Sequence, residues 1–226
     1  MKISMRENNR SMNSNNNRNK NVGRVKKSAV PADAVRDSRP AKFTLCPIAD
    51  KCGGCSWINQ PYAEQLKNKE KQLRELLTPF CRIEGVISMK QPQHYRNKVH
   101  AVFGENRYHD VISGIYEQKS HRIVPVDSCL IENAKADEII VSIRGLLKSF
   151  HLRPYNEDTG YGLLRHVLIR TGHVTGQIMV VLVLASPILP SKNNFVKALL
   201  KIHPEITTVV IGVCTPFGEC TFYQKS

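Results

Sequence analysis

Apolar residues recur with helical spacing in three stretches of the chain, and each stretch predicts a helix. The first helix should begin at Pro61, with Asn59 as a possible cap, because proline suits the first turn of a helix. Its leucines recur on one face until Pro79 ends the pattern. Residues 134–150 predict a second amphipathic helix and residues 195–202 a third.

Alternating or continuous apolar residues predict strands between these helices. The expected strands cover residues 98–103, 111–116, 122–126, 166–170, 177–185 and 207–213. The segment at 177–185 is almost wholly apolar, as in a buried central strand. Strand pairs mixed with separate helices predict an α+β domain, with a mixed or antiparallel sheet and flanking helices.

The first 42 residues have a different composition from the rest. Asparagine dominates residues 8–21, interleaved with Arg and Lys, and apolar residues are scarce. Such a segment cannot bury enough surface to offset its chain entropy, so we expect a disordered basic tail. The predicted organisation is therefore a tail at 1–42, a central domain at 43–211 and a divergent or truncated C-terminal tail at 212–226.

The chain carries a formal net charge of +14, which favours a polyanionic partner such as nucleic acid. Residues 1–45 hold eleven Lys and Arg against three Asp and Glu, so part of this charge belongs to the tail. The remaining body is still basic. The tail itself is equally consistent with loose contact to RNA phosphates and with a solvated leader.

No membrane or secretory segment is predicted. The N-terminus is polar and lacks the apolar core of a signal peptide, and the longest apolar run, 178–189, is too short to span a bilayer. We therefore expect a cytoplasmic protein. In that reducing compartment clustered cysteines serve as metal ligands more often than as disulfides.

Three of the seven cysteines, Cys46, Cys52 and Cys55, lie in a ten-residue loop, and Cys129 lies on a later segment. Four thiolates can complete a zinc site or hold an iron–sulfur cluster. Zinc sites usually pair two short motifs, whereas here the fourth ligand stands alone, so the spacing favours a cluster. Zinc and the absence of any metal remain alternatives. The other cysteines, Cys81, Cys214 and Cys220, are interpreted first as small buried hydrophobic residues.

The cysteine loop and several later blocks resemble the RNA uracil-5 methyltransferase family, which includes S-adenosylmethionine-dependent enzymes that methylate bacterial 23S rRNA. The resemblance covers about residues 43–210. It rests on Cys46-Pro47, Cys52-Gly53-Gly54-Cys55, Tyr62, Gln65-Leu66 and Lys69, on Tyr95-Arg96-Asn97-Lys98-Val99, on the block from Ser120 to Cys129, and on the block from Gly162 to Arg170.

The resemblance implies a central domain that holds a [4Fe–4S] cluster through Cys46, Cys52, Cys55 and Cys129 and helps to grip RNA. In the family a separate C-terminal domain carries the nucleophilic cysteine and the S-adenosylmethionine site. The sequence to residue 226 shows neither a glycine-rich cofactor turn nor the family's nucleophile motif. We therefore assign no catalytic or S-adenosylmethionine-binding residue and expect no activity from the chain alone. The alternative is a stand-alone RNA-binding iron–sulfur or zinc module without catalysis.

RNA, specifically 23S rRNA, is the partner that the resemblance implies, and neither a membrane nor an obligate protein partner is indicated. Arginine can fork to phosphate oxygens or stack on an unpaired base, and aromatic rings can also stack. The candidate RNA-binding residues are Tyr95, Arg96, Lys98, Arg122, Arg165, His166 and Arg170.

Overall fold

The computed structural model describes residues 46–214 and 220–224. In chain order its elements are α1 (Tyr62–Leu77), β1 (Lys98–Glu105), β2 (Val111–Tyr116), β3 (Ile123–Pro125), α2 (Ala134–Ser149), β4 (Leu164–Thr171), β5 (Ile178–Leu184), α3 (Lys192–Ile202), β6 (Ile206–Cys214) and β7 (Cys220–Gln224). The predicted tail at 1–42 lies outside the described residues, as do the side chains of β7.

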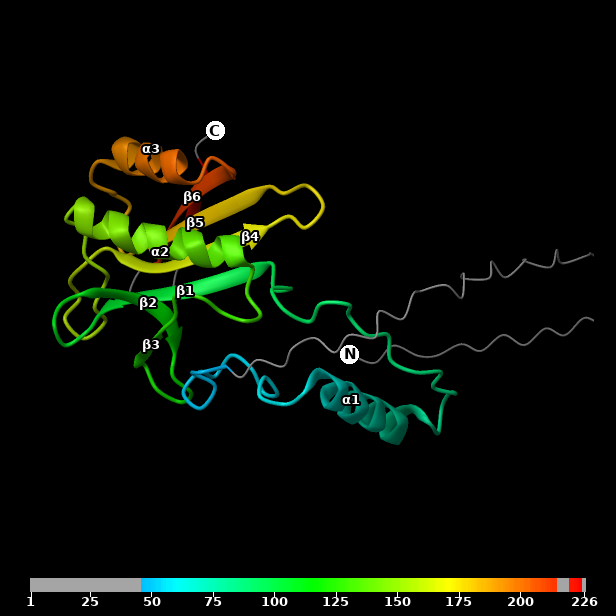
Figure 1. Ribbon diagram of the computed structural model, residues 1–226. Coiled ribbons are helices and arrows are strands. Elements are labelled where there is room, and N and C mark those ends of the chain that lie inside the picture. Colours follow the sequence, from blue (N-terminus) through cyan, green and yellow to red (C-terminus); the bar gives the residue numbers. More distant parts are fainter. Residues whose placement is uncertain (1–45, 215–219, 225–226) are drawn as a thin grey trace, which may run out of the picture. The chain divides into compact units, whose positions relative to one another are not determined.

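The described strands form one sheet in the order β3-β2-β1-β4-β5-β6-β7 (Figure 1). Neighbouring strands are antiparallel except β5 and β6, which are parallel. A parallel pair needs a crossover, and α3 supplies it. Helices α2 and α3 lie on one face of this mixed sheet. The predicted α+β class, with a mixed sheet and flanking helices, is confirmed.

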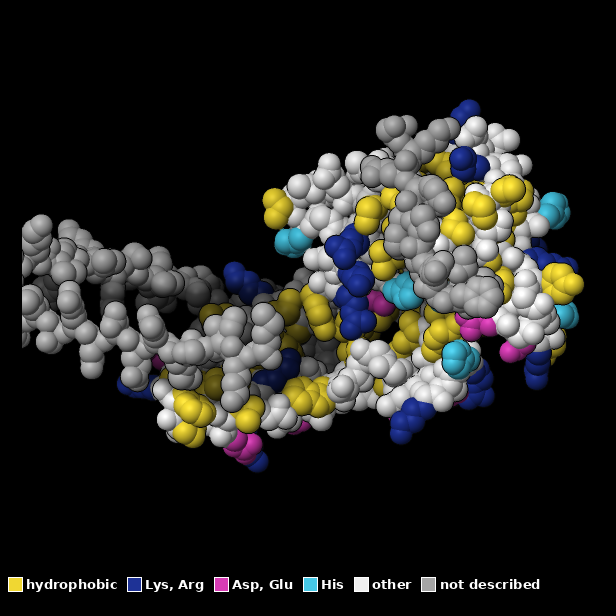
Figure 2. Space-filling model, turned by 180° about the vertical axis from the view of Figure 1, so that it is seen from behind, with side chains coloured by type: hydrophobic (Ala, Val, Ile, Leu, Met, Phe, Trp, Pro, Cys, Tyr) yellow, Lys and Arg dark blue, Asp and Glu magenta, His cyan; other side chains and the backbone are white. Residues whose placement is uncertain are grey.

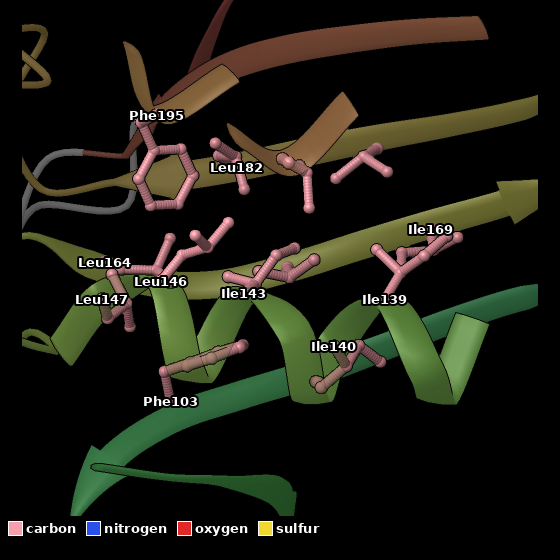
Figure 3. Packing of buried hydrophobic residues seen from close by; sticks show 14 of the residues in the cluster. Phe103, Ile139, Ile140, Ile143, Leu146, Leu147, Leu164, Ile169, Leu182 and Phe195 are labelled. Carbon is pink, nitrogen blue, oxygen red and sulfur yellow. The ribbon is translucent and has the colours of Figure 1, made fainter. Parts of the chain in front are cut away.

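The core lies between the sheet and helices α2 and α3 (Figure 3). Ile139 and Ile143 of α2 are fully buried and face strand residues such as Leu182. Asn133 caps α2, because its side chain accepts a hydrogen bond from the backbone N–H of Lys135. The apolar stripe predicted at 134–150 is therefore the stripe that the fold buries.

Helix α1 differs from its prediction at the N-terminus. Pro61 occupies the N-cap position and no side chain caps the helix, so the expected role of Asn59 is wrong. Asn59 instead accepts a hydrogen bond from the backbone N–H of Cys46 at 3.2 Å, because its amide faces the preceding cysteine turn. The helix ends at Leu77, as Pro79 predicted.

The C-terminal strands extend beyond the predicted ones. Strand β6 runs across residue 211 to Cys214, and β7 pairs with it in antiparallel register, with Val213 opposite Thr221. No strand was predicted after residue 213, because β7 is a five-residue edge strand, too short to show a clear period. No helix within the described ranges is long and apolar enough to cross a membrane.

Candidate metal centre and RNA-binding face

Three of the predicted metal ligands lie in a compact turn that precedes α1. The backbone N–H of Cys52 donates to the carbonyl of Ile48 at 2.8 Å, which closes the turn between Cys46 and Cys52. The N–H of Gly54 then points at the Cys52 sulfur, at 3.4 Å. Cys46, Cys52 and Cys55 are all half-buried.

The cysteine turn is attached to the end of strand β2. Cys52 forms an isolated antiparallel bridge with Glu117, and the N–H of Gln118 donates to the carbonyl of Lys51 at 3.4 Å. A guanidinium nitrogen of Arg96 donates to the carbonyl of Gly54, also at 3.4 Å. The sheet therefore fixes the turn from two sides, at the end of β2 and just before β1.

The fourth predicted ligand, Cys129, is held by the start of α2. Its backbone N–H donates to a carboxylate oxygen of Asp137 at 2.8 Å. Burial raises the pKa of the Cys129 thiol, while the backbone N–H groups of Ile131 and Glu132 hydrogen-bond its sulfur and oppose that rise. Such N–H groups stabilise a thiolate.

Electrostatics connect the two cysteine segments. Burial raises the pKa of the Cys55 thiol, the positive charge of Arg96 opposes the rise, and the thiols of Cys52 and Cys46 add to it. The carboxyl group of Glu132 raises the pKa of both Cys55 and Cys129. The turn thiols therefore act on one another, and Cys55 and Cys129 share Glu132 as a neighbour.

The four thiols do not surround a single point. In the part of the chain that the structure describes, no three His, Cys, Asp or Glu side chains are grouped closely enough to hold one metal ion. The donor set itself still suits an iron–sulfur cluster, because N–H groups point at the sulfurs of Cys52 and Cys129 and a guanidinium lies near Cys55. The predicted ligand set stays a prediction.

Cys81 and Cys214 were both expected to be small buried residues. Cys81 is exposed, so that interpretation is wrong for it; it follows α1 in a segment that the core does not cover. Cys214 is partly buried against the small cluster of Val181, Val183 and Val210, but it is disulfide-bonded, so the interpretation as a small buried hydrophobic residue is wrong for it too. The side chain of Cys220 lies outside the described residues.

A buried pair of carboxyl groups beside the thiols was not predicted. Glu132 and Asp137 are both buried and hydrogen-bond each other. Burial, with Asp137 as the next cause, raises the pKa of Glu132 to about 7. The sequence gives no signal for this pair, because acidic residues near a helix start are ordinarily exposed and favourable there.

The sheet face away from α2 and α3 carries the predicted basic residues of β1 and β4. Lys98 stands directly opposite Arg170 in the register of these strands. The rings of His100 and His166 lie beside each other, with centroids 4.9 Å apart. Figure 2 shows Lys and Arg side chains in a row near a His side chain on this face. His100 lies two residues after Lys98 on this face and was not among the predicted RNA-binding residues.

Of these side chains, His166 has the largest change in pKa. Burial, followed by the charges of His100 and Arg165, lowers its pKa to about 4, so the ring is neutral near pH 7. Its Nδ1 atom is buried without a hydrogen-bond partner. A neutral imidazole can stack on a base but offers no charge to a phosphate.

The predicted RNA-binding residues divide by their contacts. Arg122 forks to the Glu117 carboxylate at 2.8 and 2.7 Å, and Arg165 donates to Glu157 at 2.9 Å. Within the described residues, Lys98 and Arg170 have no carboxylate within 4.0 Å, and the exposed Tyr95 lies just before β1. Lys98 and Arg170 can therefore bind phosphates without first breaking an ion pair.

A cavity of about 660 Å³ lies between the cysteine turn and this sheet face. Its walls come from Gly53 and Gly54 of the turn, from alternate residues of β1 beginning at Lys98, from the end of β2, and from residues 117–121. Arg96 and Lys98, two of the predicted RNA-binding residues, both line it. The fold and site thus define an α+β protein in which a thiol-bearing turn adjoins a basic face.

No protein-family model matches the chain. It is 36% identical over 186 residues to a Halalkalibacterium halodurans protein and 37% identical over 188 residues to a Clostridium acetobutylicum protein, both named uncharacterized RNA methyltransferases. These alignments each cover 80% of this chain but only 40% and 39% of the relatives. The chain thus spans about two fifths of their length.

A solved structure also shares the fold. The Pyrococcus abyssi tRNA (uracil-54, C5)-methyltransferase, crystallised with S-adenosyl-L-homocysteine, matches with a TM-score of 0.56 and 23% identity, over 80% of this chain and 42% of that one. These similarities confirm the predicted relationship. Over about 80% of its length the chain is related to proteins named RNA methyltransferases, and it shares its fold with this tRNA uracil methyltransferase.

Proposed function

We propose that this chain is the iron–sulfur and RNA-binding part of an S-adenosylmethionine-dependent (uracil-5) methyltransferase that acts on 23S rRNA. RNA methylation is proposed because the relatives are named RNA methyltransferases. Methylation at uracil C5 and the cofactor class are proposed because the structural neighbour is a tRNA (uracil-54, C5)-methyltransferase crystallised with S-adenosyl-L-homocysteine. The chain spans about 40% of those relatives, and methyl transfer is assigned to the remainder of such a protein.

The position of Arg96 between the cysteine turn and the basic face is the observation that carries this proposal. The Arg96 guanidinium donates to the Gly54 carbonyl in the cysteine turn, and its charge opposes the rise that burial causes in the pKa of Cys55. The same side chain lines the cavity next to Lys98. A change in the cysteine turn would therefore alter the position of the basic face, which connects metal binding to RNA binding.

The residues that would hold a [4Fe–4S] cluster are Cys46, Cys52, Cys55 and Cys129. When bound, the cluster would join the turn to the segment before α2, a structural role in a compartment that disfavours disulfides. Burial raises the pKa of the Cys55 and Cys129 thiols; the positive charge of Arg96 at Cys55 and the N–H groups of Ile131 and Glu132 at Cys129 oppose that rise.

The metal assignment is tested by measuring iron and acid-labile sulfide in protein purified without oxygen. We expect about four of each per chain, lost together in Cys55→Ser. Cys81→Ser is the matched control, because Cys81 is exposed and outside the ligand set, and it should retain the metal. Zinc in the protein, or an unchanged metal content in Cys55→Ser, would contradict the cluster.

The RNA-binding assignment is tested with the double variant Arg96→Ala, Lys98→Ala. Its affinity for a single-stranded RNA should fall, and its salt dependence should become shallower by roughly one to two in the log–log slope. The control, Lys197→Ala with Lys201→Ala, removes the same charge from α3 on the other side of the sheet and should bind as the parent does. An unchanged slope in the first variant would exclude these residues as phosphate contacts.

A further inference from the structure

We infer that the cavity between the cysteine turn and the sheet is a pocket for a single unpaired nucleotide, with its base against the aromatic wall and its phosphate among the cations. This inference rests on the proposed function, because it needs a chain that binds RNA. It goes beyond general phosphate contact by assigning a base-binding site within this domain.

The size and position of the cavity favour a small ligand over an extended duplex. A volume of about 660 Å³ falls within the usual range for small-molecule pockets. The cavity is bounded by the cysteine turn on one side and by residues 117–121 on another. A base in a duplex exposes only its edge, so a base that stacks on the rings of this hollow must first leave its own stack.

Rings line the wall that would receive the base. His100, Tyr116 and His121 all face the cavity. The ring centroids of Tyr116 and His121 lie 5.3 Å apart, and those of His100 and His166 lie 4.9 Å apart. Partial burial and the charge of Lys98 lower the pKa of His100, which favours the neutral ring with its π face. Stacking of this kind holds bases with little regard to sequence.

The charges of the pocket suit a phosphate. Arg96, Lys98 and Lys119 contribute positive charge to its walls. Of the two carboxyl groups that also line it, Glu117 is forked by Arg122, while Glu132 is buried and hydrogen-bonded to Asp137. The acidic residues therefore offset little of the positive charge, and an anionic group is favoured near the cations.

The backbone at Lys119 also points to a constrained binding wall. Lys119 has a φ of 59°, a left-handed conformation that costs energy for a residue with a side chain. The turn from 117 to 121 is held at its base, where Arg122 pairs with Glu117 and the N–H of Ser120 donates to the Glu117 carbonyl at 3.0 Å. This geometry keeps Lys119 and His121 at the rim.

The test compares ligands of matched charge on the complete chain. The four nucleoside 5′-monophosphates and ribose 5-phosphate carry the same phosphate, and only the nucleotides have a base. We expect at least one nucleotide to bind about tenfold more tightly than ribose 5-phosphate by NMR titration, and to compete with a single-stranded RNA. Equal binding of nucleotide and ribose 5-phosphate would overturn the pocket.

Two variants locate the effect. His100→Ala and His121→Ala should each lose most of the preference for the nucleotide, and both residues are exposed enough to leave the fold intact. His173→Ala, in the exposed connection between β4 and β5, is the matched control and should keep the preference. Preserved preference in both pocket variants would place the base elsewhere and overturn the inference.

The same titrations separate this inference from the proposed function. RNA binding with a normal salt dependence, but no preference for nucleotides over ribose 5-phosphate, would overturn the pocket and leave RNA binding intact. Failure of the RNA itself to bind would overturn both.

Discussion

Helices α1 and α2 have the same length and opposite surroundings. Each has 16 residues with a clear apolar stripe. Seven residues of α2 are buried in the core, whereas no residue of α1 is buried in the structure. Leu76 of α1 is 69% exposed and Ile143 of α2 is 0% exposed.

The contrast shows what periodicity can and cannot establish. An apolar stripe at helical spacing indicates a helix, but burial depends on an element that comes to cover the stripe. For α2 that element is the sheet (Figure 3). Helix α1 instead relies on polar attachments, in which the Gln65 amide donates to the carbonyls of Trp57 and Gln60 at 3.0 and 2.9 Å.

The largest expected effect tests this contrast directly. Ile143→Ala should lower the free energy of unfolding by about 2–5 kcal/mol, because it leaves a cavity between α2 and the sheet. Leu76→Ala should change it by less than about 0.5 kcal/mol. Urea unfolding followed by circular dichroism measures both. A large loss in Leu76→Ala would mean that α1 is covered in solution.

The two faces of the sheet give a second comparison, and pH can sharpen it. His166 lies on the face without helices, and its pKa of about 4 is below its ordinary value of 6.5. The unfolded chain therefore takes up a proton at a higher pH than the folded chain does. The contribution of the neutral His166 to the free energy of unfolding is fully present above pH 6.5, and it is lost as the pH falls from 6.5 towards 4.

In His166→Leu the leucine side chain does not titrate. The free energy of unfolding of this variant should therefore fall less than that of the parent between pH 7 and pH 5. We expect a difference of about 1 kcal/mol, after allowance for solvent screening of a partly exposed side chain. Chemical unfolding at the two pH values measures it. The control His173→Leu, at an exposed site, should keep the parent's pH dependence. Equal dependence in His166→Leu and the parent would mean that the folded His166 titrates normally.

Much of the fold was predictable because its elements are local patterns. The stripe at 134–150 and the apolar run at 177–185 appear as α2 and β5, each within a few residues. The pairing order was not predictable, because placing β1 beside β4 depends on contacts between residues 64 to 72 positions apart. The short edge strand β7 also escaped, since it has too few residues to show a period.

The candidate site was predictable where residue type alone carries the chemistry. Cys52 and Cys55 stood out by their spacing, and Lys98 by its charge on an alternating strand. Glu132 and Asp137 were missed because only their burial makes them unusual, and burial follows from the tertiary fold. His100 became part of the basic face only when the register brought His166 beside it.

The smallest expected effect concerns Lys98 and Arg170, which stand opposite each other across β1 and β4. Like charges in this position destabilise a sheet, so a face that keeps them does so for a reason other than stability. Lys98→Met removes the repulsion and retains the aliphatic stem. It should raise the free energy of unfolding by about 0.3 kcal/mol at low salt, and less at high salt because ions screen exposed charges.

The same variant should bind single-stranded RNA more weakly, since one phosphate contact is lost. Stability and affinity would then change in opposite directions, which is the signature of a residue retained for its ligand. Arg170→Met should give the same pair of effects, and the double variant should gain less stability than the sum of the two, because each substitution already removes the shared repulsion. Lys98→Met with lower stability and unchanged RNA affinity would instead identify Lys98 as a packing residue of β1.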